Sequence, residues 1–357
     1  MINNKFSSRE RVRTALNHQT TDRIPIGMIC GNINEPALNK LNDYLLSTRG
    51  ISAKEYIDSF LDLTEINACG GYDNEKDIWG VERKNINYGE GSYNEISFYP
   101  LKEMNTIEEI NKYSFPKVTH MNADEVVEQI TEVRRSKDTA IVLTNANLFE
   151  TLWYMRGFEN AMMDMMLQPE FIHTIMGKVT DFFIEYFYKI LAKSKDDVDL
   201  VFTADDIGQQ EGLLLSLEMW EEFIKPYHVR LNDMIHNMNT EVIYHTDGSI
   251  TEAVPGLIDM GIDVLQALQF SANNMDPIHL KDNFGNDLCF EGGMCVQKIL
   301  PFGTRDEVID ETRKLITVLG NSGGYICGPS HYIQSGTPPE NITAFFDEAT
   351  NFYPFDN

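Results

Sequence analysis

Val242-Ile243-Tyr244-His245-Thr246-Asp247-Gly248 shows in one short stretch how this chain is built. Three residues of strand-like character lead into a histidine and an aspartate, and an amphipathic helical pattern begins at Ile250. A strand with polar residues at its carboxyl end, followed by a helix, indicates one βα unit of a parallel sheet. An imidazole and a carboxylate two residues apart at such a strand end can bind a metal or move a proton.

The same unit recurs along the whole chain. The eight strand candidates are Ile24–Cys30, Leu61–Ala68, Ala140–Ala146, Leu200–Ala204, Val242–Tyr244, Val264–Leu268, Leu288–Glu291 and Tyr325–Cys327. Because each is followed by helix, the chain is expected to form parallel strands with crossover helices. Eight such units predict an α/β fold, a (β/α)8 TIM barrel, with residues 1–357 as one domain. A doubly wound open sheet is the alternative.

Residues 70–116 interrupt this rhythm. The segment is rich in Gly, Asn, Asp and Tyr, and a short hairpin is expected around residues 88–93. We interpret it as an insertion folded over the carboxyl ends of the strands, because a structureless loop of this length is unusual in a compact domain. Three of its aromatic residues, Tyr72, Trp79 and Tyr88, are candidates for a lid over a planar substrate, with surface packing as the alternative.

Polar residues follow the strand candidates with a regularity that favours the barrel. They are Asn145, Asp205, Asp206, His245, Asp247, Gln266, Gln269, Glu291 and His331. A barrel brings the carboxyl ends of all its strands to one mouth, so residues far apart in sequence can converge there. Asp205 or Asp206 can serve as an acid or base, or can cap the following segment.

Composition excludes several classes of function. There are 55 acidic and 29 basic residues, giving a formal net charge of −26. Such acidity argues against binding to nucleic acid or to an anionic membrane surface. Five cysteines without framework spacing, and the lack of a signal-peptide or membrane-spanning pattern, lead us to expect a reduced, cytoplasmic protein. No C-x-x-C, H-E-x-x-H or P-loop spacing occurs.

Several motifs together resemble the uroporphyrinogen decarboxylase superfamily, from about residue 7 to about residue 350. They are Ser8-Arg9-Glu10-Arg11-Val12, Asp22-Arg23-Ile24-Pro25, Asp205-Asp206-Ile207-Gly208, His245-Thr246-Asp247-Gly248, Leu300-Pro301-Phe302-Gly303-Thr304 and the run from Gly323 through His331 to Asn341. The resemblance implies a (β/α)8 barrel. True decarboxylases of this superfamily carry an arginine-rich stretch after the first strand, where this chain has residues 28–34, Met-Ile-Cys-Gly-Asn-Ile-Asn. Without those arginines, decarboxylation of a polycarboxylate porphyrinogen is the runner-up function.

The other branch of the superfamily is similar to corrinoid-dependent methyltransferases. In its thiol-methylating members a zinc is held by a His-x-Cys pair and a later cysteine. This chain matches the histidine with His245 but has Asp247 and His331 where the cysteines stand. A thiol-activating zinc is therefore disfavoured, although zinc or another metal on His245, Asp247 and His331 remains chemically sensible.

The substitution of cysteine by aspartate directs the hypothesis to an oxygen leaving group, which a proton donor or a Lewis acid assists. We expect a methyltransferase that moves a methyl group from a small methoxylated, aromatic substrate to the Co(I) corrinoid of a partner protein. A thiol acceptor is the alternative, and the chain is compatible with a homodimer. In this hypothesis the catalytic residues are His245, Asp247, Asp205 and His331: Asp247 or His245 supplies the proton, and Asp205 and His331 shape the charge around it. The residues expected to bind substrate are Asn145, Asp206, Gln209, Gln266 and Glu291.

Overall fold

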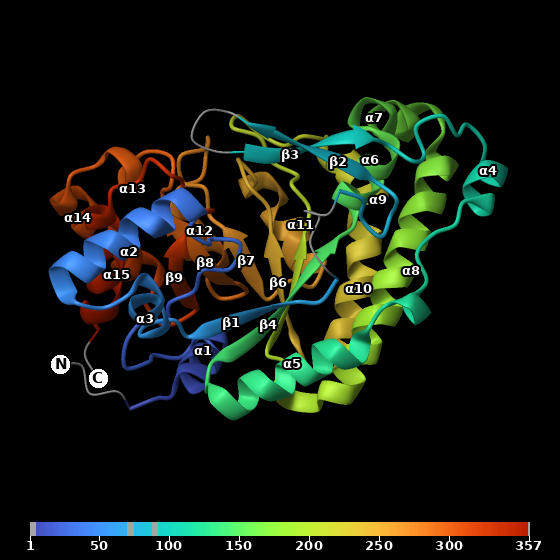
Figure 1. Ribbon diagram of the computed structural model, residues 1–357. Coiled ribbons are helices and arrows are strands. Elements are labelled where there is room, and N and C mark those ends of the chain that lie inside the picture. The colour runs from blue at the N-terminus through green and yellow to red at the C-terminus, as the bar shows by residue number, and fades with distance from the viewer. Residues whose placement is uncertain (1–4, 70–74, 88–91, 356–357) are drawn as a thin grey trace.

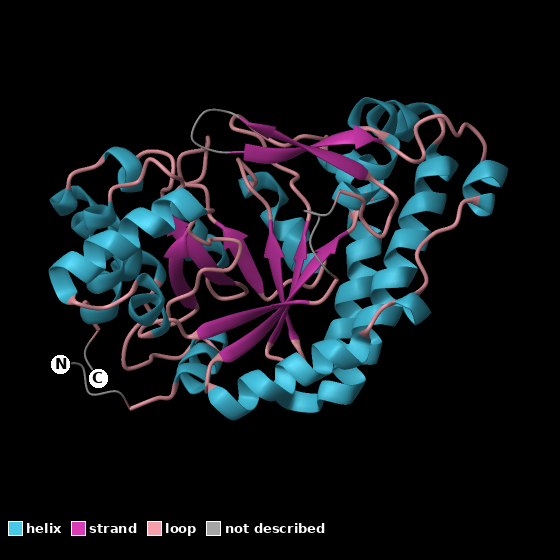
Figure 2. Ribbon diagram, in the orientation of Figure 1, coloured by secondary structure: helices cyan, strands magenta, loops and turns pink. Residues whose placement is uncertain are grey.

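A computed structural model describes residues 5–69, 75–87 and 92–355. Seven parallel strands form one curled sheet in the order β1-β4-β5-β6-β7-β8-β9, surrounded by helices (Figures 1 and 2). The strands are β1 (Leu63–Asn67), β4 (Ala140–Asn147), β5 (Leu200–Ala204), β6 (Glu241–His245), β7 (Val264–Ala267), β8 (Cys289–Met294) and β9 (Tyr325–Pro329). The expected α/β barrel architecture is confirmed, with one change at its seam.

The first strand candidate, Ile24–Cys30, is the seam. Only a single parallel bridge, Ile26 to Cys327, joins it to β9. Around that bridge, Gly27 N donates to Cys327 O and Cys327 N donates to Pro25 O. On the other side Asp62 N donates to Ile26 O, so this short extended segment closes the ring between β9 and β1. The prediction of a full strand is wrong, since Pro25 lacks an N–H and the chain turns away at Cys30, whose φ is +49°.

The barrel interior is layered because alternate residues of each strand face inward. The lower layer is apolar and includes Leu63, Val142, Ile243, Val264 and Ile326 among its buried residues. Two residues further along their strands, the inward positions carry Glu65, His245, Gln266 and Glu291. Polarity therefore rises from the base of the barrel to the mouth.

At the base, an aspartate stands immediately before each of three strands. Asp62, Asp199 and Asp263 precede β1, β5 and β7. Each carboxylate accepts a hydrogen bond from a backbone N–H of the neighbouring strand position: those of Ile26 (2.8 Å), Ile141 (2.9 Å) and Val242 (2.7 Å) respectively. The repeated device fixes the register of adjacent strands where the barrel begins.

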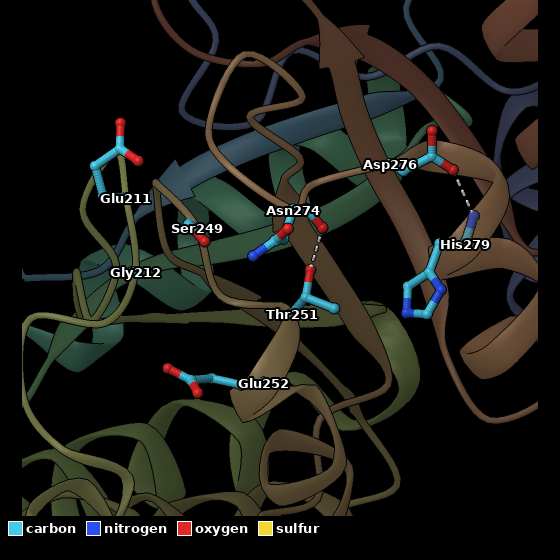
Figure 3. Close-up of a pocket in the computed structure, with 8 residues that line it drawn as sticks. All are labelled: Glu211, Gly212, Ser249, Thr251, Glu252, Asn274, Asp276 and His279. Carbon is cyan, nitrogen blue, oxygen red and sulfur yellow. Dashed lines mark hydrogen bonds between the residues drawn. The ribbon is translucent and has the colours of Figure 1, made fainter.

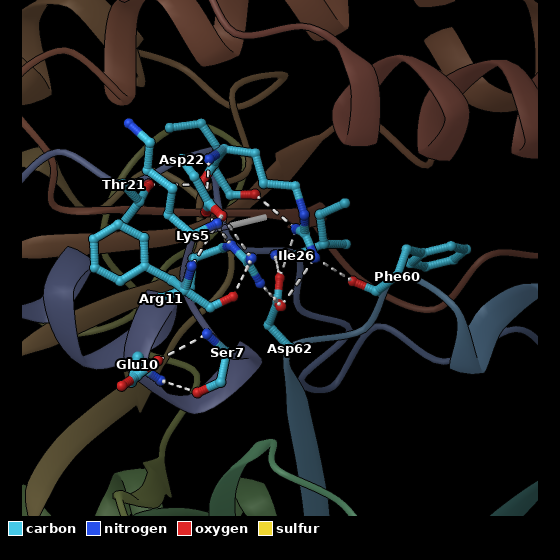
Figure 4. A network of polar contacts seen from close by, with 12 residues as sticks. Lys5, Ser7, Glu10, Arg11, Thr21, Asp22, Ile26, Phe60 and Asp62 are labelled. Atoms are coloured by element: carbon cyan, nitrogen blue, oxygen red, sulfur yellow. Dashed lines mark hydrogen bonds and ion pairs between the residues drawn. The ribbon is translucent and has the colours of Figure 1, made fainter. Parts of the chain in front are cut away.

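Asp62 is also the centre of a buried ion-pair network (Figure 4). Its carboxylate accepts hydrogen bonds from Arg11 Nη1 (2.7 Å) and from Arg23 Nη1 (2.7 Å) and Nη2 (3.0 Å). Arg11 also donates to both carboxylate oxygens of Asp22 (Nε to Oδ1, 2.7 Å; Nη2 to Oδ2, 3.1 Å). These four side chains are at most 7% exposed. The network pins the N-terminal helix to the base of the barrel.

The helices pack outside the sheet. Their bounds are α1 (Ser8–Leu16), α2 (Glu35–Arg49), α3 (Ala53–Asp58), α4 (Ile107–Lys112), α5 (Ala123–Ser136), α6 (Phe149–Arg156), α7 (Phe158–Leu167), α8 (Pro169–Ser194), α9 (Leu217–Phe223), α10 (Lys225–Asn237), α11 (Val254–Asp259), α12 (Pro277–Phe284), α13 (Ile299–Phe302), α14 (Arg305–Leu319) and α15 (Pro339–Asn351). Short 3-10 turns are η1 (Val118–His120), η2 (Lys195–Asp197) and η3 (Thr251–Ala253). Among the described helices, none is long and apolar enough to cross a membrane.

The insertion contains an antiparallel hairpin, β2 (Glu82–Asn87) with β3 (Ser92–Phe98), which lies above the carboxyl ends of the barrel strands in Figure 1. The predicted hairpin turn, together with Tyr72 and Tyr88, falls outside the described residues. Trp79 is not a lid residue: it is 2% exposed and packs against Phe182 and Phe183, with ring centroids 5.0 and 5.7 Å away. Burial of this ring anchors the insertion to α8.

Candidate active site

Four of the predicted site residues converge at the mouth of the barrel. His245 ends β6, and Asp206, Asp247 and His331 follow β5, β6 and β9. His245 Nε2 lies 3.7 Å from Asp206 Oδ1, and His331 Nε2 lies 3.9 Å from Asp247 Oδ2. The two imidazole rings are 5.9 Å apart, centroid to centroid. Carboxylates and imidazoles that approach without closing into short hydrogen bonds leave room for a ligand between them.

Two glycines allow the loops after β5 and β6 to touch. A Cβ at Gly208 would stand 2.3 Å from the carbonyl oxygen of Asp247, and Gly248 has a φ of +88° with the backbone of Gly208 directly against it. The contact also lets Asp247 N donate to Asp206 Oδ1 at 3.2 Å. Gly208, two residues after Asp206, and Gly248, directly after Asp247, therefore allow the close approach of the two loops that sets the two carboxylates side by side.

Gln266 orients His245. The amide nitrogen of Gln266 donates to the carbonyl oxygen of Ile29 at 2.7 Å, so its oxygen is the atom that faces His245 Nδ1, with which it forms a hydrogen bond. Nδ1 must then carry the proton, which leaves the lone pair on Nε2 facing the mouth. Gln266 is fully buried and its amide is occupied, so we reassign it from substrate binding to positioning His245.

The mouth favours neutral forms of its acid and its second histidine. Burial, with a contribution from Asp206, raises the pKa of Asp247 above its ordinary value, although His245 and His331 act to lower it. Burial, with His245, lowers the pKa of His331 against the opposing pull of Asp247. His331 Nδ1 accepts the backbone N–H of Tyr332 at 2.8 Å, so the neutral ring carries its proton on Nε2, toward Asp247. Both shifts act in the direction of the uncharged form of each group.

Cys30 is a site residue that the sequence analysis missed. Its Sγ and one ring nitrogen each of His245 and His331 all lie within 4.8 Å of one another. Burial, together with Glu65 and Asp247, raises the pKa of the Cys30 thiol. Its one sequence signal was its place at the end of an apolar run, and only closure of the ring brings it across to His245.

Glu291 lies in the polar layer beneath the mouth. It is fully buried, and neither carboxylate oxygen has a hydrogen-bond partner among the described residues. Gly27 and Gly328 make room for it, because a Cβ at either would come within 2.9 Å of Oε1. Burial, with the charge of Glu65, raises the pKa of Glu291 well above its ordinary value. We therefore place it below the predicted substrate position.

Asp205 is engaged in structure. Its Oδ2 accepts from Phe149 N (2.9 Å) and its Oδ1 from Glu150 N (2.8 Å), which caps the first turn of α6. The buried His228 Nε2 is 2.6 Å from Oδ2. With both oxygens occupied and no exposed surface, Asp205 is reassigned from catalysis to holding α6 at the mouth. It caps the helix after β4, whereas the sequence suggested the segment after its own strand.

Glu150 is a second residue that the sequence analysis did not single out. It stands in the first turn of α6, with Tyr154 Oη donating to Oε1 at 3.1 Å and the Asn147 amide donating to Oε2. Burial, with the charges of Asp206 and Asp205, raises the pKa of Glu150 to about 8. The mouth therefore holds a further carboxylic acid that retains its proton near neutral pH.

The remaining predicted substrate residues lie at the periphery. Asn145 has a φ of +79° at a bulge in β4, and its amide donates to Asn67 Oδ1 at 2.7 Å on the β1 side of the mouth. Gln209 is exposed, and its backbone oxygen accepts from Ser249 N at 2.7 Å. Among the described hydrogen bonds and ion pairs, none joins either side chain to His245, and their role in binding substrate stays a prediction.

Two groups of donor atoms at the mouth suit a cation, and His245 belongs to both. One group is Cys30, His245 and His331, and the other is Asp206, His245 and Asp247. The predicted metal ligands His245, Asp247 and His331 are thus present but are divided between two overlapping sets. A sulfur and nitrogen set favours zinc-like ions, whereas carboxylates also suit harder cations.

A surface cavity of about 640 Å³ lies beside this cluster, lined by the loops after β5, β6 and β7 (Figure 3). Thr251 Oγ1 donates to Asn274 O at 2.8 Å, and Asp276 caps α12 by accepting from His279 N at 2.8 Å. None of the clustered donor residues lines the cavity, and its two glutamates, Glu211 and Glu252, are exposed. We therefore centre the site on His245.

Comparison with known proteins gives one family. The family model described as uroporphyrinogen decarboxylase (URO-D) matches residues 85–352. A solved structure of a methyltransferase from Methanosarcina mazei superposes with a TM-score of 0.71 at 16% identity, covering 97% of this chain and 98% of that one. At that identity the likeness shows the fold alone.

Two curated proteins are similar over part of their length. A methylated-thiol–coenzyme M methyltransferase from Methanosarcina mazei is 29% identical over 197 residues, which is 55% of this chain and 49% of that protein. Uroporphyrinogen decarboxylase 2, chloroplastic, from Oryza sativa subsp. japonica is 25% identical over 186 residues, 51% of this chain and 43% of that protein. The matched region spans about half the length of each relative.

Proposed function

This chain belongs to the uroporphyrinogen decarboxylase family, and from that premise we propose that it is a methyltransferase that demethylates a small methoxylated, aromatic compound. The acceptor is the Co(I) corrinoid of a partner protein. The observation that carries the proposal is the pairing at the mouth of an oriented His245 with the protonation-prone Asp247. Similarity to a methylated-thiol–coenzyme M methyltransferase supports methyl transfer over decarboxylation.

The proposed reaction requires the protein to protonate the oxygen that leaves the methyl group. Cobalt(I) attacks the methyl carbon with its electron pair, the carbon–oxygen bond breaks, and the aryl oxide leaves with that bond's electrons. Asp247, whose pKa is raised by burial, donates a proton to the departing oxygen so that a neutral phenol forms. Asp247 and His331 are 31% and 41% exposed, so water reaches the mouth and returns a proton to Asp247. Bonds, electrons and the proton are then balanced.

A cation fits the same mouth. The donor atoms of Cys30, His245 and His331, or of Asp206, His245 and Asp247, lie within 4.8 Å of one another. Bound there, zinc would supply Lewis-acid stabilisation of the leaving oxygen. His245 offers Nε2 to either function, because Gln266 holds the proton on Nδ1.

The first βα segment argues against the decarboxylase function. Residues 28–34 carry Cys30 and Asn32 but no arginine. A porphyrinogen with several carboxylates needs cationic partners, and the ion pairs of Asp206 and Asp247 among the described residues involve only histidines. A site this acidic repels such a substrate.

The experiment mixes purified protein with a reduced corrinoid protein and a panel of aryl methyl ethers. We expect the absorbance change of methyl-cobalt formation together with an equimolar phenol. His245→Gln should lower the rate by about 10²–10⁴-fold, while His236→Gln, on an exposed histidine away from the mouth, should leave it unchanged.

Each alternative has its own signature in the same assay. Methyl-cobalt formation from methylated thiols but from no ether would replace the proposed donor with a thioether. Conversion of uroporphyrinogen to coproporphyrinogen would reinstate the decarboxylase function. Inactivity toward all three substrate classes would refute the proposal.

A further inference from the structure

The backbone at Cys30 is held in an unusual conformation. Its φ of +49° is in the left-handed region, which is strained for a residue that carries a Cβ. Cys30 N donates to Glu65 Oε1 at 3.0 Å, and the preceding carbonyl, that of Ile29, accepts from Gln266 Nε2 at 2.7 Å. These contacts fix where the thiol points, and strain of this kind concentrates at functional sites.

The thiol points toward the two histidines. Cys30 Sγ and the ring nitrogens of His245 and His331 lie within 4.8 Å of one another. In a tetrahedral zinc site with bonds of about 2.0–2.3 Å, neighbouring donor atoms are roughly 3.3–3.8 Å apart. A contraction of about 1 Å would therefore bring these three atoms onto one ion.

One residue serves both fixed donors. Gln266 Oε1 takes the proton of His245 Nδ1, and Gln266 Nε2 holds the carbonyl next to Cys30. A hydrogen bond to the far nitrogen of a ligating histidine sets its tautomer and its direction, as partners of metal ligands commonly do. The same buried amide thus aligns a sulfur donor from the first segment and a nitrogen donor from β6.

The charge around the cluster also suits a cation. Asp206 and Asp247 flank His245, and Glu65 and Glu291 act on Cys30 from below. Glu291 is fully buried with both oxygens unpartnered among the described residues. The described interactions of Asp247 and His331 include no lysine or arginine.

From this geometry we propose that Cys30 is a metal ligand and that Cys30, His245 and His331 bind a zinc-like divalent cation, with one position left open. The role of this metal in methyl transfer rests on the proposed function, whereas metal binding itself is tested independently. Cys30 and His245 are the fixed pair. His331 is 41% exposed and completes the set from the solvent side. To bind the cation through Nε2, its ring must carry the proton on Nδ1. Nδ1 then no longer accepts the hydrogen bond from Tyr332 N.

The proposal gives the site a sulfur donor that its loops after β6 and β9 lack. Asp247 and His331 stand where thiolates would be expected in a thiol-activating site, and Cys30 reaches the same place from the segment that is bridged to β9. One sulfur with two nitrogens keeps affinity for zinc while leaving the ion more electrophilic than two thiolates do. Asp206 and Asp247 remain available for proton transfer.

Cobalt(II) reports the ligand directly. Metal-free protein is titrated with Co(II) while the near-ultraviolet band of thiolate-to-cobalt charge transfer is recorded, and zinc affinity is measured by competition with a chromophoric chelator. We expect the band at one Co(II) per chain, its loss in Cys30→Ser, and zinc binding weakened by at least about 10²-fold. Cys295→Ser is the matched control, since Cys295 is half-buried and outside the cluster, and it should retain the band.

Gln266 and His331 supply two further readouts. Gln266→Leu should weaken zinc by about 10–100-fold without abolishing the band, and His331→Ala should weaken it less than Cys30→Ser does. Circular dichroism of each variant establishes that it is folded.

Three results would overturn the proposal: no Co(II) binding, binding without a charge-transfer band, or a band that survives in Cys30→Ser. Normal metal binding with no methyl transfer would defeat the proposed function and leave this metal site standing.

Discussion

The two ends of the barrel use the same kinds of side chain in opposite ways. At the base, the Asp62 carboxylate is held by Arg11, by Arg23 and by the Ile26 backbone N–H, all at 2.7–3.0 Å. At the mouth, Asp206 and Asp247 stand 3.7 and 3.9 Å from the histidines nearest to them. The base satisfies its charges within the fold, and the mouth leaves them to be satisfied by a ligand.

The charged residues at the base therefore stabilise the fold, and those at the mouth are available for binding and catalysis. A carboxylate with short charged hydrogen bonds on both oxygens has no capacity left for a substrate or a proton. Asp247 lacks such partners, and its burial, with the charge of Asp206 beside it, raises its pKa and costs stability. TIM-barrel enzymes commonly place catalysis at the carboxyl ends of their strands, in line with this division.

The largest effect is expected from breaking the base. Asp62→Ala removes the partner of two buried guanidinium groups and should lower the free energy of unfolding by about 3–5 kcal/mol in urea denaturation. Asp247→Ala, at the mouth, should change it by less than about 1 kcal/mol. Equal losses in the two variants would erase the distinction between base and mouth.

Asp205 tests the comparison, because it lies at the mouth but both of its carboxylate oxygens have short hydrogen bonds, as those of Asp62 do at the base. Asp205→Ala leaves two backbone N–H groups at the start of α6, and His228, without their acceptor. Urea denaturation should show a loss of about 2–4 kcal/mol. Unchanged stability together with lost activity would restore the catalytic role predicted from the sequence.

Glu150 should give the stability of the mouth a dependence on pH. Its pKa is about 8 in the fold against an ordinary value of 4.5, so folding takes up a proton between these values. The stabilisation is complete below about pH 4.5 and is lost as the pH rises toward 8. The free energy of unfolding of the wild type should therefore fall by about 1–2 kcal/mol over this interval. This is less than the full shift would give, because partial exposure screens the charge.

Glu150→Gln should flatten that dependence, and Glu159→Gln, on the exposed face of α7, should not. The measurement is the urea midpoint at about pH 5.5 and about pH 8 for all three proteins. Parallel pH profiles for wild type and Glu150→Gln would place the titrating group elsewhere.

The smallest expected effect is a gain in stability at the mouth. Asp206 is 49% exposed and repels Asp247, so Asp206→Asn should raise stability by about 0.5–1 kcal/mol, seen as a small increase in Tm. The same substitution in the base, Asp62→Asn, should lower Tm. A destabilised Asp206→Asn variant would show that the mouth, too, is built for stability.

Much of the architecture could be predicted from local pattern. The expected strand Leu200–Ala204 is β5, and the strand expected from Ala140 to Ala146 is β4, which ends one residue later at Asn147. Both strands begin with an uninterrupted apolar run, which is the strongest local signal for a buried strand. Local pattern failed where single residues redirect the chain: Pro25 and Cys30, whose φ is +49°, leave an isolated bridge at Ile26 where a full strand was expected.

The candidate site was predicted in part. His245, Asp247, Asp206 and His331 do converge, because parallel strands deliver their carboxyl ends to one mouth. Sequence position could not separate Asp205 from Asp206, since adjacent residues point to opposite sides and only packing against α6 shows which one is occupied. Gln266 likewise looked available until its amide was found between His245 and Ile29.

The sequence by itself therefore determined the order of βα units, the acidic balance, and which chemical groups stand at the strand ends, because these depend on residues close together in the chain. The tertiary structure alone decided which of those groups are free. Closure of the ring through Ile26 and Cys327 brings Cys30, 215 positions before His245 in sequence, to the same mouth. Which side chains meet across a barrel depends on their burial and on the direction in which they point. The local sequence of one strand does not contain that information.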